Sequence, residues 1–172
     1  MAITPDTKNW TWVLKEPCPE CGLAAGDVDP TTVGDRVRAA LPRWEEALSR
    51  DDARERPDDH TWSPTEYACH VRDVFRLFPG RAALMLEQVD PEFEGWDQDE
   101  TAVADRYDTQ DPADVAPQLV EAGERIADVF DAVSDDEWAR TGRRSDGDSF
   151  TVATLAQYFL HDMEHHLHDV RG

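Results

Sequence analysis

The sequence predicts an all-α protein, a four-helix bundle preceded by an irregular N-terminal extension. Three observations support this fold class: four segments have apolar residues at helical spacing, several begin with helix-capping residues, and no segment shows a convincing strand alternation. A chain of 172 residues can bury one core and does not require a second domain. We therefore expect an extension over residues 1–28, which contains the CPECG segment, and one helical domain over residues 29–172.

The first helix is expected to follow residues 1–28, in which prolines, glycines and tryptophans show no sustained period. Asp29 is a suitable N-cap and Pro30 suits the first helical position. Apolar residues at helical spacing then continue to about Arg50. Pro42 lies inside this segment and predicts a kink.

The second helix has the clearest start in the chain. Ser63 at the N-cap, Pro64 at the first position and Glu66 at the third form a capping box, in which side chains pair with backbone donors that have no partner within the helix. The helix is expected to reach about Phe78. After the Pro-Gly dipeptide that follows, RAALMLEQV either extends this helix or forms a separate helical piece.

The remaining two helices are predicted from periodicity. The third covers about Pro112 to Val133, and the fourth runs from about Thr151 to the C-terminus. Between them, residues 134–150 are rich in charged residues and glycine, which predicts a loop. The polar segment over residues 91–110 shows no clear helical period.

Composition restricts the partners of the protein. Acidic residues outnumber basic residues 38 to 17, for a formal net charge of −21. Such a charge repels phosphate backbones and anionic lipids, so nucleic acid and membrane surfaces are not expected as partners. We find no leader sequence or membrane span and only three cysteines, which together favour a reducing, cytoplasmic location.

Four of the six histidines lie in HDMEHHLHDV, residues 161–170. On a helix that turns about 100° per residue, His161, His165 and His168 share one face, while His166 points elsewhere. Two imidazoles four residues apart can reach one cation, as in helical HxxxH zinc motifs. The pair alone is more often a polar helix face, because the apolar stripe of this helix lies roughly opposite His161.

His70 is the candidate for a third ligand. It lies at the edge of the apolar stripe of the second predicted helix, where it could reach a neighbouring helix. Glu66 and Asp73 lie three or four residues away and could orient its imidazole. The alternative is a histidine at the core edge that bonds to Asp73.

Cys18 and Cys21, in CPECG, have the spacing of half a zinc ribbon. A closed structural site needs two more ligands, and Cys69 and His60 remain, so a site of Cys18, Cys21 and Cys69 is one interpretation. A redox-active dithiol and simple buried thiols are the alternatives.

WSPTEYACHVRDV, residues 62–74, and TVATLAQYFLHDMEHHLHDV, residues 151–170, resemble the DinB/YfiT-like superfamily. Its members keep one histidine on helix two and an HxxxH on helix four, and the resemblance extends over about residues 30–170. It implies a four-helix bundle, often dimeric, with a divalent metal such as nickel or zinc on His70, His161 and His165. The CPECG segment is not part of the superfamily motif.

Three histidine ligands leave coordination positions open, as in catalytic metal sites. An open position can activate water for hydrolysis or hold a thiolate for transfer, and the resemblance implies both, including a mycothiol-dependent maleylpyruvate isomerase and thiol S-transferases. We expect a metal-dependent, mycothiol-type S-transferase or isomerase that takes a small-molecule substrate and a low-molecular-weight thiol. A hydrolase and a non-catalytic, metal- or ligand-binding stress-response protein are the alternatives. Asp73 or Glu164 could orient the ligands, and His168 could carry a proton.

Overall fold

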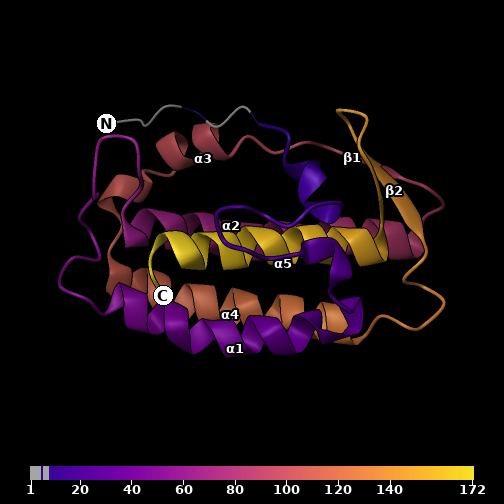
Figure 1. The fold of residues 1–172 in the computed structure, drawn as a ribbon, viewed down its shortest axis with the longest axis horizontal. Helices are drawn as coiled ribbons and strands as arrows, with labels where there is room; N and C mark the ends of the chain where they lie inside the picture. Colours follow the sequence, from indigo (N-terminus) through magenta and orange to yellow (C-terminus); the bar gives the residue numbers. More distant parts are fainter. Residues whose placement is uncertain (1–4, 6–7) are drawn as a thin grey trace.

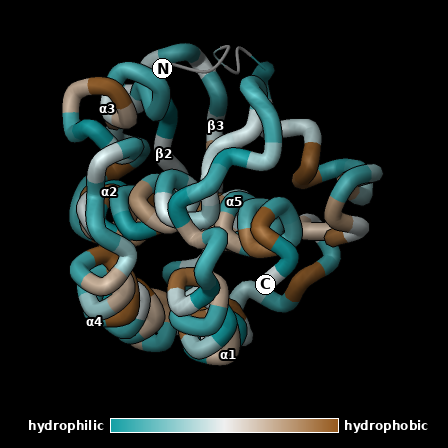
Figure 2. Tube along the Cα trace, turned by 90° about the vertical axis from the view of Figure 1, so that its left-hand side faces the viewer, coloured by the Kyte–Doolittle hydropathy of each residue, from teal (hydrophilic) through white to brown (hydrophobic). Residues whose placement is uncertain are grey.

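The computed structural model describes residue 5 and residues 8–172, and its main body is a bundle of four long helices (Figure 1). Seen from the end, α2 and α5 form one layer and α1 and α4 form the other (Figure 2). Their bounds are Val33–Leu48 for α1, Pro64–Glu87 for α2, Pro112–Asp131 for α4 and Val152–Asp169 for α5. Four helices were predicted in these regions, and the bundle confirms that part of the predicted fold class.

A small sheet corrects the all-α prediction. It contains β1 (Glu92–Phe93), β2 (Thr141–Arg144) and β3 (Ser149–Thr151), in the order β1-β2-β3, with β1 parallel to β2 and β2 antiparallel to β3. The β2–β3 hairpin replaces the loop predicted for residues 134–150. Its turn includes Gly147 at φ 101°, preceded by an aspartate, and Asp-Gly is a common hairpin signal. The strands have only two to four residues, which is too short for alternation to reveal them.

The predicted capping box of α2 is confirmed. The helix extends beyond Phe78, the end expected for its first part. Ser63 Oγ accepts from the Glu66 backbone N–H at 3.2 Å, and a Glu66 carboxylate oxygen accepts from the Ser63 N–H at 2.9 Å. The helix continues through Pro79 to Glu87, so RAALMLEQV extends it. Met85, in this extension, is buried in the core, and its burial opposes the cost of a proline inside the helix.

The other helix starts follow the sequence with small differences. Asp29 caps a single 3-10 turn, η3 (Pro30–Thr32), and α1 begins after it and continues through Pro42. Thr151 caps α5 by accepting from the Thr154 backbone N–H at 3.0 Å. One short helix was not predicted, α3 (Gln98–Ala104), which is followed by the 3-10 turn η4 (Tyr107–Thr109).

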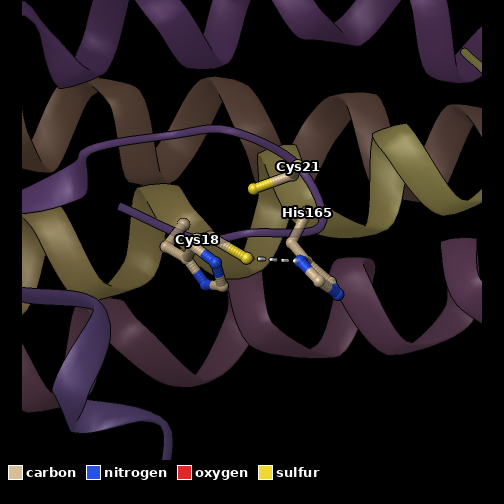
Figure 3. Close-up of side chains that lie close together, drawn as sticks. Cys18, Cys21 and His165 are labelled. Carbon is tan, nitrogen blue, oxygen red and sulfur yellow. Dashed lines mark hydrogen bonds between the residues drawn. The ribbon is translucent and has the colours of Figure 1, made fainter. Parts of the chain in front are cut away.

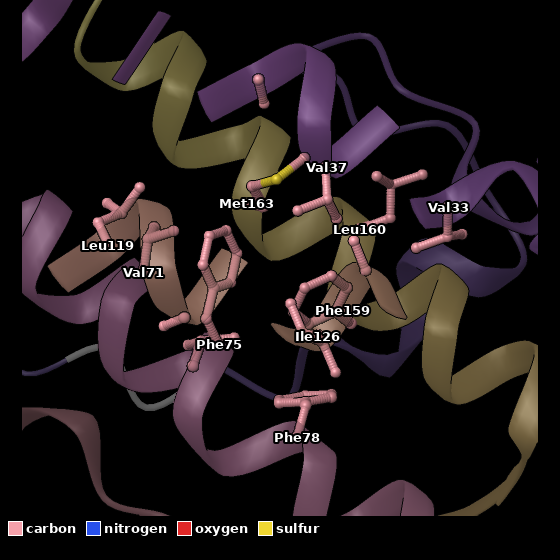
Figure 4. Close-up of a cluster of buried hydrophobic side chains, with 14 of the residues drawn as sticks. Val33, Val37, Val71, Phe75, Phe78, Leu119, Ile126, Phe159, Leu160 and Met163 are labelled. Carbon is pink, nitrogen blue, oxygen red and sulfur yellow. The ribbon is translucent and has the colours of Figure 1, made fainter. Parts of the chain in front are cut away.

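Aromatic side chains from three helices meet in the core. The ring of Phe159, on α5, lies 5.6 Å from that of Phe75 and 5.2 Å from that of Phe78 (Figure 4). The ring of Phe130, on α4, lies 5.2 Å from that of Phe159. All four side chains are buried. Such close packing fixes α5 against its neighbours, and it therefore also fixes the direction of each polar side chain on α5.

The N-terminal segment lies against α5 (Figure 1). It contains two 3-10 turns, η1 (Trp10–Leu14) and η2 (Ala25–Asp27). The Gln157 side-chain amide, on α5, donates to the carbonyl oxygens of Gly26 at 3.2 Å and Val28 at 2.8 Å. Among the described residues, no helix combines the length and the apolar character needed to cross a membrane.

Candidate metal centre

Two pairs of potential ligands lie on α5, each with a spacing of four residues. His161 and His165 form one pair, and Asp162 and His166 form the other. Because an α-helix turns about 100° per residue, the second pair points in a different direction from the first. His161 and His165 face the N-terminal segment, whereas Asp162 and His166 face α2.

His70, Asp162 and His166 come together between α2 and α5. His70 is fully buried, and its Nε2 lies 3.2 Å and 3.4 Å from the two carboxylate oxygens of Asp162. The His166 ring meets the His70 ring edge-on, with centroids 4.8 Å apart. One donor atom from each of the three residues lies within 4.8 Å of the others. We call this group the His70–Asp162–His166 cluster.

The electrostatics of the cluster favour an ionised carboxylate. Burial alone would raise the pKa of Asp162, but attraction to His70 and a hydrogen bond with it outweigh burial and hold that pKa at about 2. His166 Nδ1 lies 3.0 Å from a carboxylate oxygen of Asp169, which directs the opposite ring nitrogen toward the cluster. Carboxylates hold metal-binding histidines in this way in many proteins.

Aromatic rings enclose the cluster. Trp96 stacks on His70 with centroids 5.4 Å apart and an interplanar angle of 14°, and Trp62 lies 5.9 Å from the same ring. Tyr67 stacks on His166 at 5.0 Å. These rings shield the imidazoles from water and limit access to the side on which Asp162 is partly exposed.

A cavity of about 1320 Å³ opens beside the cluster, and Asp162 forms part of its wall. Aromatic and basic side chains share the lining with acidic residues. The aromatic residues are Trp10, Trp62, Phe78, Trp96 and Tyr158, and the basic residues are Lys8, Arg56, Arg81, Arg106 and Arg144. A small molecule in this cavity would therefore contact a potential metal ligand directly.

The His70–Asp162–His166 cluster fits a divalent cation. Two imidazoles and one carboxylate are a common ligand set of catalytic zinc, and three protein ligands leave at least one position for water or substrate. His70 Nδ1 is buried and has no hydrogen-bond partner among the described residues. Buried polar atoms without partners are rare and often mark functional sites.

The structure does not bring the three predicted ligands together. His70 belongs to the cluster with Asp162 and His166, while His161 and His165 lie beside Cys18 and Cys21. The sequence did contain a signal for this arrangement, since Asp162 and His166 repeat the four-residue spacing one position later. A search for histidines alone misses it, because a carboxylate occupies one of the two positions.

The predicted catalytic side chains lie away from the cluster. Asp73 accepts a 2.5 Å hydrogen bond from the Tyr107 hydroxyl, which ties α2 to η4. Glu164 forms an ion pair with Arg36 of α1 at 2.7 Å. His168 is exposed, at a small hollow of the surface that Glu164 also lines. Asp169, which the sequence analysis did not consider, is the carboxylate that contacts His166.

Cys69 does not join Cys18 and Cys21. Its thiol donates a 3.4 Å hydrogen bond to the Gln110 side-chain oxygen, and burial raises its pKa to about 12. Burial also raises the pKa of the Cys21 thiol to about 11. Redox-active CxxC motifs depend on a lowered thiol pKa, and the surroundings of Cys21 have the opposite effect.

Together, the four-helix bundle and the ligand cluster between α2 and α5 define a class of helical protein with a candidate metal centre. The sequence profile of the DinB superfamily matches residues 34–170. Because this match covers most of the chain, the protein belongs to the DinB superfamily, as its sequence motifs predict.

Among solved structures, the fold is similar to YfiT from Bacillus subtilis, with a TM-score of 0.69 and 20% sequence identity over 83% of this chain and 82% of that chain. YfiT is described as "a probable metal-dependent hydrolase with an unusual four-helix bundle topology". At this level of identity the likeness shows a shared fold. A search of the curated proteins finds no significant match.

Proposed function

We propose that the protein is a metal-dependent hydrolase that holds a divalent cation at His70, Asp162 and His166. The observation that carries this proposal is the position of Asp162, which is a member of the ligand cluster and also part of the cavity wall. A structural ion would normally be closed off by a fourth protein ligand. Here the open side faces a space that admits a small molecule.

A divalent cation, when bound, supplies a Lewis acid that polarises a carbonyl or phosphoryl oxygen and makes water more acidic. The side chains of this protein would position and protect the reacting groups. Asp169 orients His166, and the rings of Trp62 and Trp96 keep bulk water away from His70. The description of YfiT as a probable hydrolase supports this class of reaction.

Arg81 supports an anionic substrate. It lies in the cavity wall with its guanidinium carbon 5.1 Å from the Phe78 ring and 5.0 Å from the Phe93 ring. Nη2 donates to the Glu94 carbonyl at 3.1 Å, whereas Nε has no hydrogen-bond partner and the side chain forms no ion pair among the described residues. Burial and repulsion from Arg144 lower its pKa to about 10, so it stays cationic near neutral pH. A carboxylate or phosphate on the substrate would compensate this buried charge.

Thiol transfer is a second candidate, and the size of the cavity favours it. Small-molecule sites commonly measure roughly 300–1,000 Å³, and the cavity of about 1320 Å³ is larger. It has room for a substrate together with a low-molecular-weight thiol such as mycothiol. In that reaction the cation, zinc or nickel, would serve to hold the thiol as thiolate.

Metal analysis of protein purified without a histidine tag tests the site. His70→Ala and Asp162→Asn should each lose one equivalent of bound metal. His60→Ala should retain it, because His60 is exposed and lies before α2. If the metal content of the His70→Ala and Asp162→Asn proteins equals that of the wild type, the ligand assignment is incorrect.

Two assays of the metal-loaded protein then separate the candidate reactions. Hydrolysis of anionic esters, amides or phosphoesters, lost in Asp162→Asn, would support the hydrolase. Conjugation of cysteine, glutathione or mycothiol to monochlorobimane, with no hydrolysis, would support thiol transfer instead. If neither activity depends on the metal, the catalytic proposal fails and a metal-binding role remains.

A further inference from the structure

We propose that Cys18, Cys21, His161 and His165 form a second metal site, a closed zinc site that fastens the N-terminal segment to α5. We call these four residues the Cys2His2 cluster. The site differs in ligands and in position from the His70–Asp162–His166 cluster, and the proposal does not depend on the proposed enzymatic activity.

The four side chains already converge. One donor atom from each lies within 4.8 Å of the others, and Cys18 Sγ lies 3.6 Å from His165 Nδ1. Figure 3 shows the thiols of Cys18 and Cys21 on the N-terminal segment, next to His165 on α5. Cys18, His161 and His165 are each at least nine-tenths buried. Small shifts of the side chains would bring all four donors to the distances of about 2.0–2.3 Å that zinc requires.

The local backbone presents both thiols to one side. The Cys18 N–H donates to the Leu23 carbonyl at 2.9 Å, and the Gly22 N–H donates to the Cys18 carbonyl at 2.8 Å, so the chain forms a tight turn around Cys21. Gly22 has a φ of 78°, a conformation that favours glycine, directly after the second cysteine. The CPECG sequence therefore specifies a turn that suits two thiolates on one ion.

The histidines contribute from a rigid element. His161 and His165 lie one helical turn apart, and their ring centroids are 5.1 Å apart. His161 Nε2 is buried and has no hydrogen-bond partner among the described residues. An unpartnered, buried imidazole nitrogen beside two thiols is well explained as a ligand.

The donor set favours zinc in a structural role. Two thiolates and two imidazoles complete a tetrahedron, which leaves no position for substrate, and thiolates favour zinc over harder cations. None of the four residues is among those that line the cavity of about 1320 Å³. The site would instead hold Trp10, whose ring lies 5.7 Å from His161 and 5.2 Å from His165, in the wall of that cavity.

Metal stoichiometry tests this proposal separately from the proposed function. Cys21→Ser should lose one equivalent of zinc, and Cys69→Ala should keep the wild-type content, since Cys69 contacts Gln110 instead. Substituting cobalt should produce thiolate-to-metal charge-transfer absorption in the wild type and in His70→Ala, but not in Cys21→Ser. If Cys21→Ser keeps its full zinc content, or if the wild type carries a Cys18–Cys21 disulfide and no thiolate-bound metal, the proposal is overturned.

Cleavage by lysyl endopeptidase offers a second measurement, which can be made on the wild-type protein with and without zinc. Lys8 and Lys15 are the only lysines in the chain, and Lys15 is exposed in the N-terminal segment. Chelation of zinc should increase the rate of cleavage after Lys15 several-fold, and added zinc should restore protection. Cys21→Ser should be cleaved rapidly with or without zinc, and Cys69→Ala should behave as the wild type. Cleavage that is independent of zinc in the wild type would contradict the fastening role.

Discussion

His165 and His166 are neighbours in the chain but belong to different clusters. His165 Nδ1 lies 3.6 Å from Cys18 Sγ, whereas the His166 ring packs edge-on against His70 at 4.8 Å. Asp169 lies between them, 3.7 Å from His165 Nε2 and 3.0 Å from His166 Nδ1. A single helix can therefore serve two metal sites, because adjacent side chains point in different directions.

This division predicts different results for two histidines on the same helix. His166→Ala removes a ligand of the His70–Asp162–His166 cluster, and we expect kcat/KM to fall by roughly 100-fold or more, beyond the losses usual for residues that only support a ligand. His168→Ala serves as the control, because His168 is exposed and outside the cluster, and its activity should stay near that of the wild type. Steady-state kinetics with metal analysis would check this, and equal losses in both variants would contradict the cluster assignment.

Asp169 is expected to act through His166, to which it lies closer than to His165. Asp169→Asn should weaken metal affinity by about 10- to 100-fold, because the amide no longer stabilises the orientation and basicity of His166. Zinc titration with a competing chelator measures this affinity. Asp128→Asn is a suitable control, since Asp128, on α4, is exposed and pairs with Arg38 of α1. If the two variants bind zinc equally well, Asp169 has no positioning role.

Glu66 is expected to make stability depend on pH. Burial raises the pKa of this carboxyl, but hydrogen bonds from Arg56 and Ser63 outweigh burial and hold the pKa below its usual 4.5. A pKa that is lower in the folded state stabilises the fold above the pKa of the unfolded chain, and this stabilisation is lost as pH falls through the folded value. Glu66→Gln should therefore cost roughly 1.5–3 kcal/mol near neutral pH and progressively less below about pH 4.5.

Urea unfolding of metal-free protein, from about pH 7 to pH 3, measures the difference between the wild type and Glu66→Gln. Glu121→Gln is the matched control, because the Glu121 side chain is 79% exposed and lies 3.9 Å from Arg125. Its effect should stay within about 0.5 kcal/mol at every pH. A difference for Glu66→Gln that does not change with pH would mean that the charge of Glu66 does not stabilise the fold.

The sequence predicts the helices better than it predicts the site. The capping box of α2 and the apolar periodicity locate the starts of the four long helices to within a few residues, because both signals are local. The hairpin and α3 escape detection because each is short and lacks a repeated pattern. The family motif identifies His70 correctly as a residue between the two helices. It assigns His161 and His165 to the same site, whereas the structure places Asp162 and His166, the other pair with this spacing, beside His70.

That choice depends on tertiary packing. Both pairs have the spacing of one helical turn, and they differ by a rotation of about 100° around α5. The rotation of α5 is set by contacts distant in sequence, such as those of Phe159 with Phe75 and Phe130. The position of CPECG beside α5 also depends on a distant contact, the hydrogen bonds from Gln157 to the backbone at Gly26 and Val28. Local patterns do not contain this information.

Arg81 predicts how the proposed enzyme would select its substrate. Its buried guanidinium lines the cavity and has no carboxylate partner among the described residues, so it should bind the anionic group of the substrate. Arg81→Gln should raise KM for an anionic substrate by about 10-fold or more and leave kcat within a few-fold, because a charge-assisted hydrogen bond contributes roughly 1.5–3 kcal/mol. For a neutral analogue of the same size, KM should be almost unchanged.

Arg76→Gln is the control, because Arg76 is half exposed and contacts Asp73 away from the cavity. An equal rise in KM for the neutral and the anionic substrate would mean that Arg81 shapes the cavity without recognising charge.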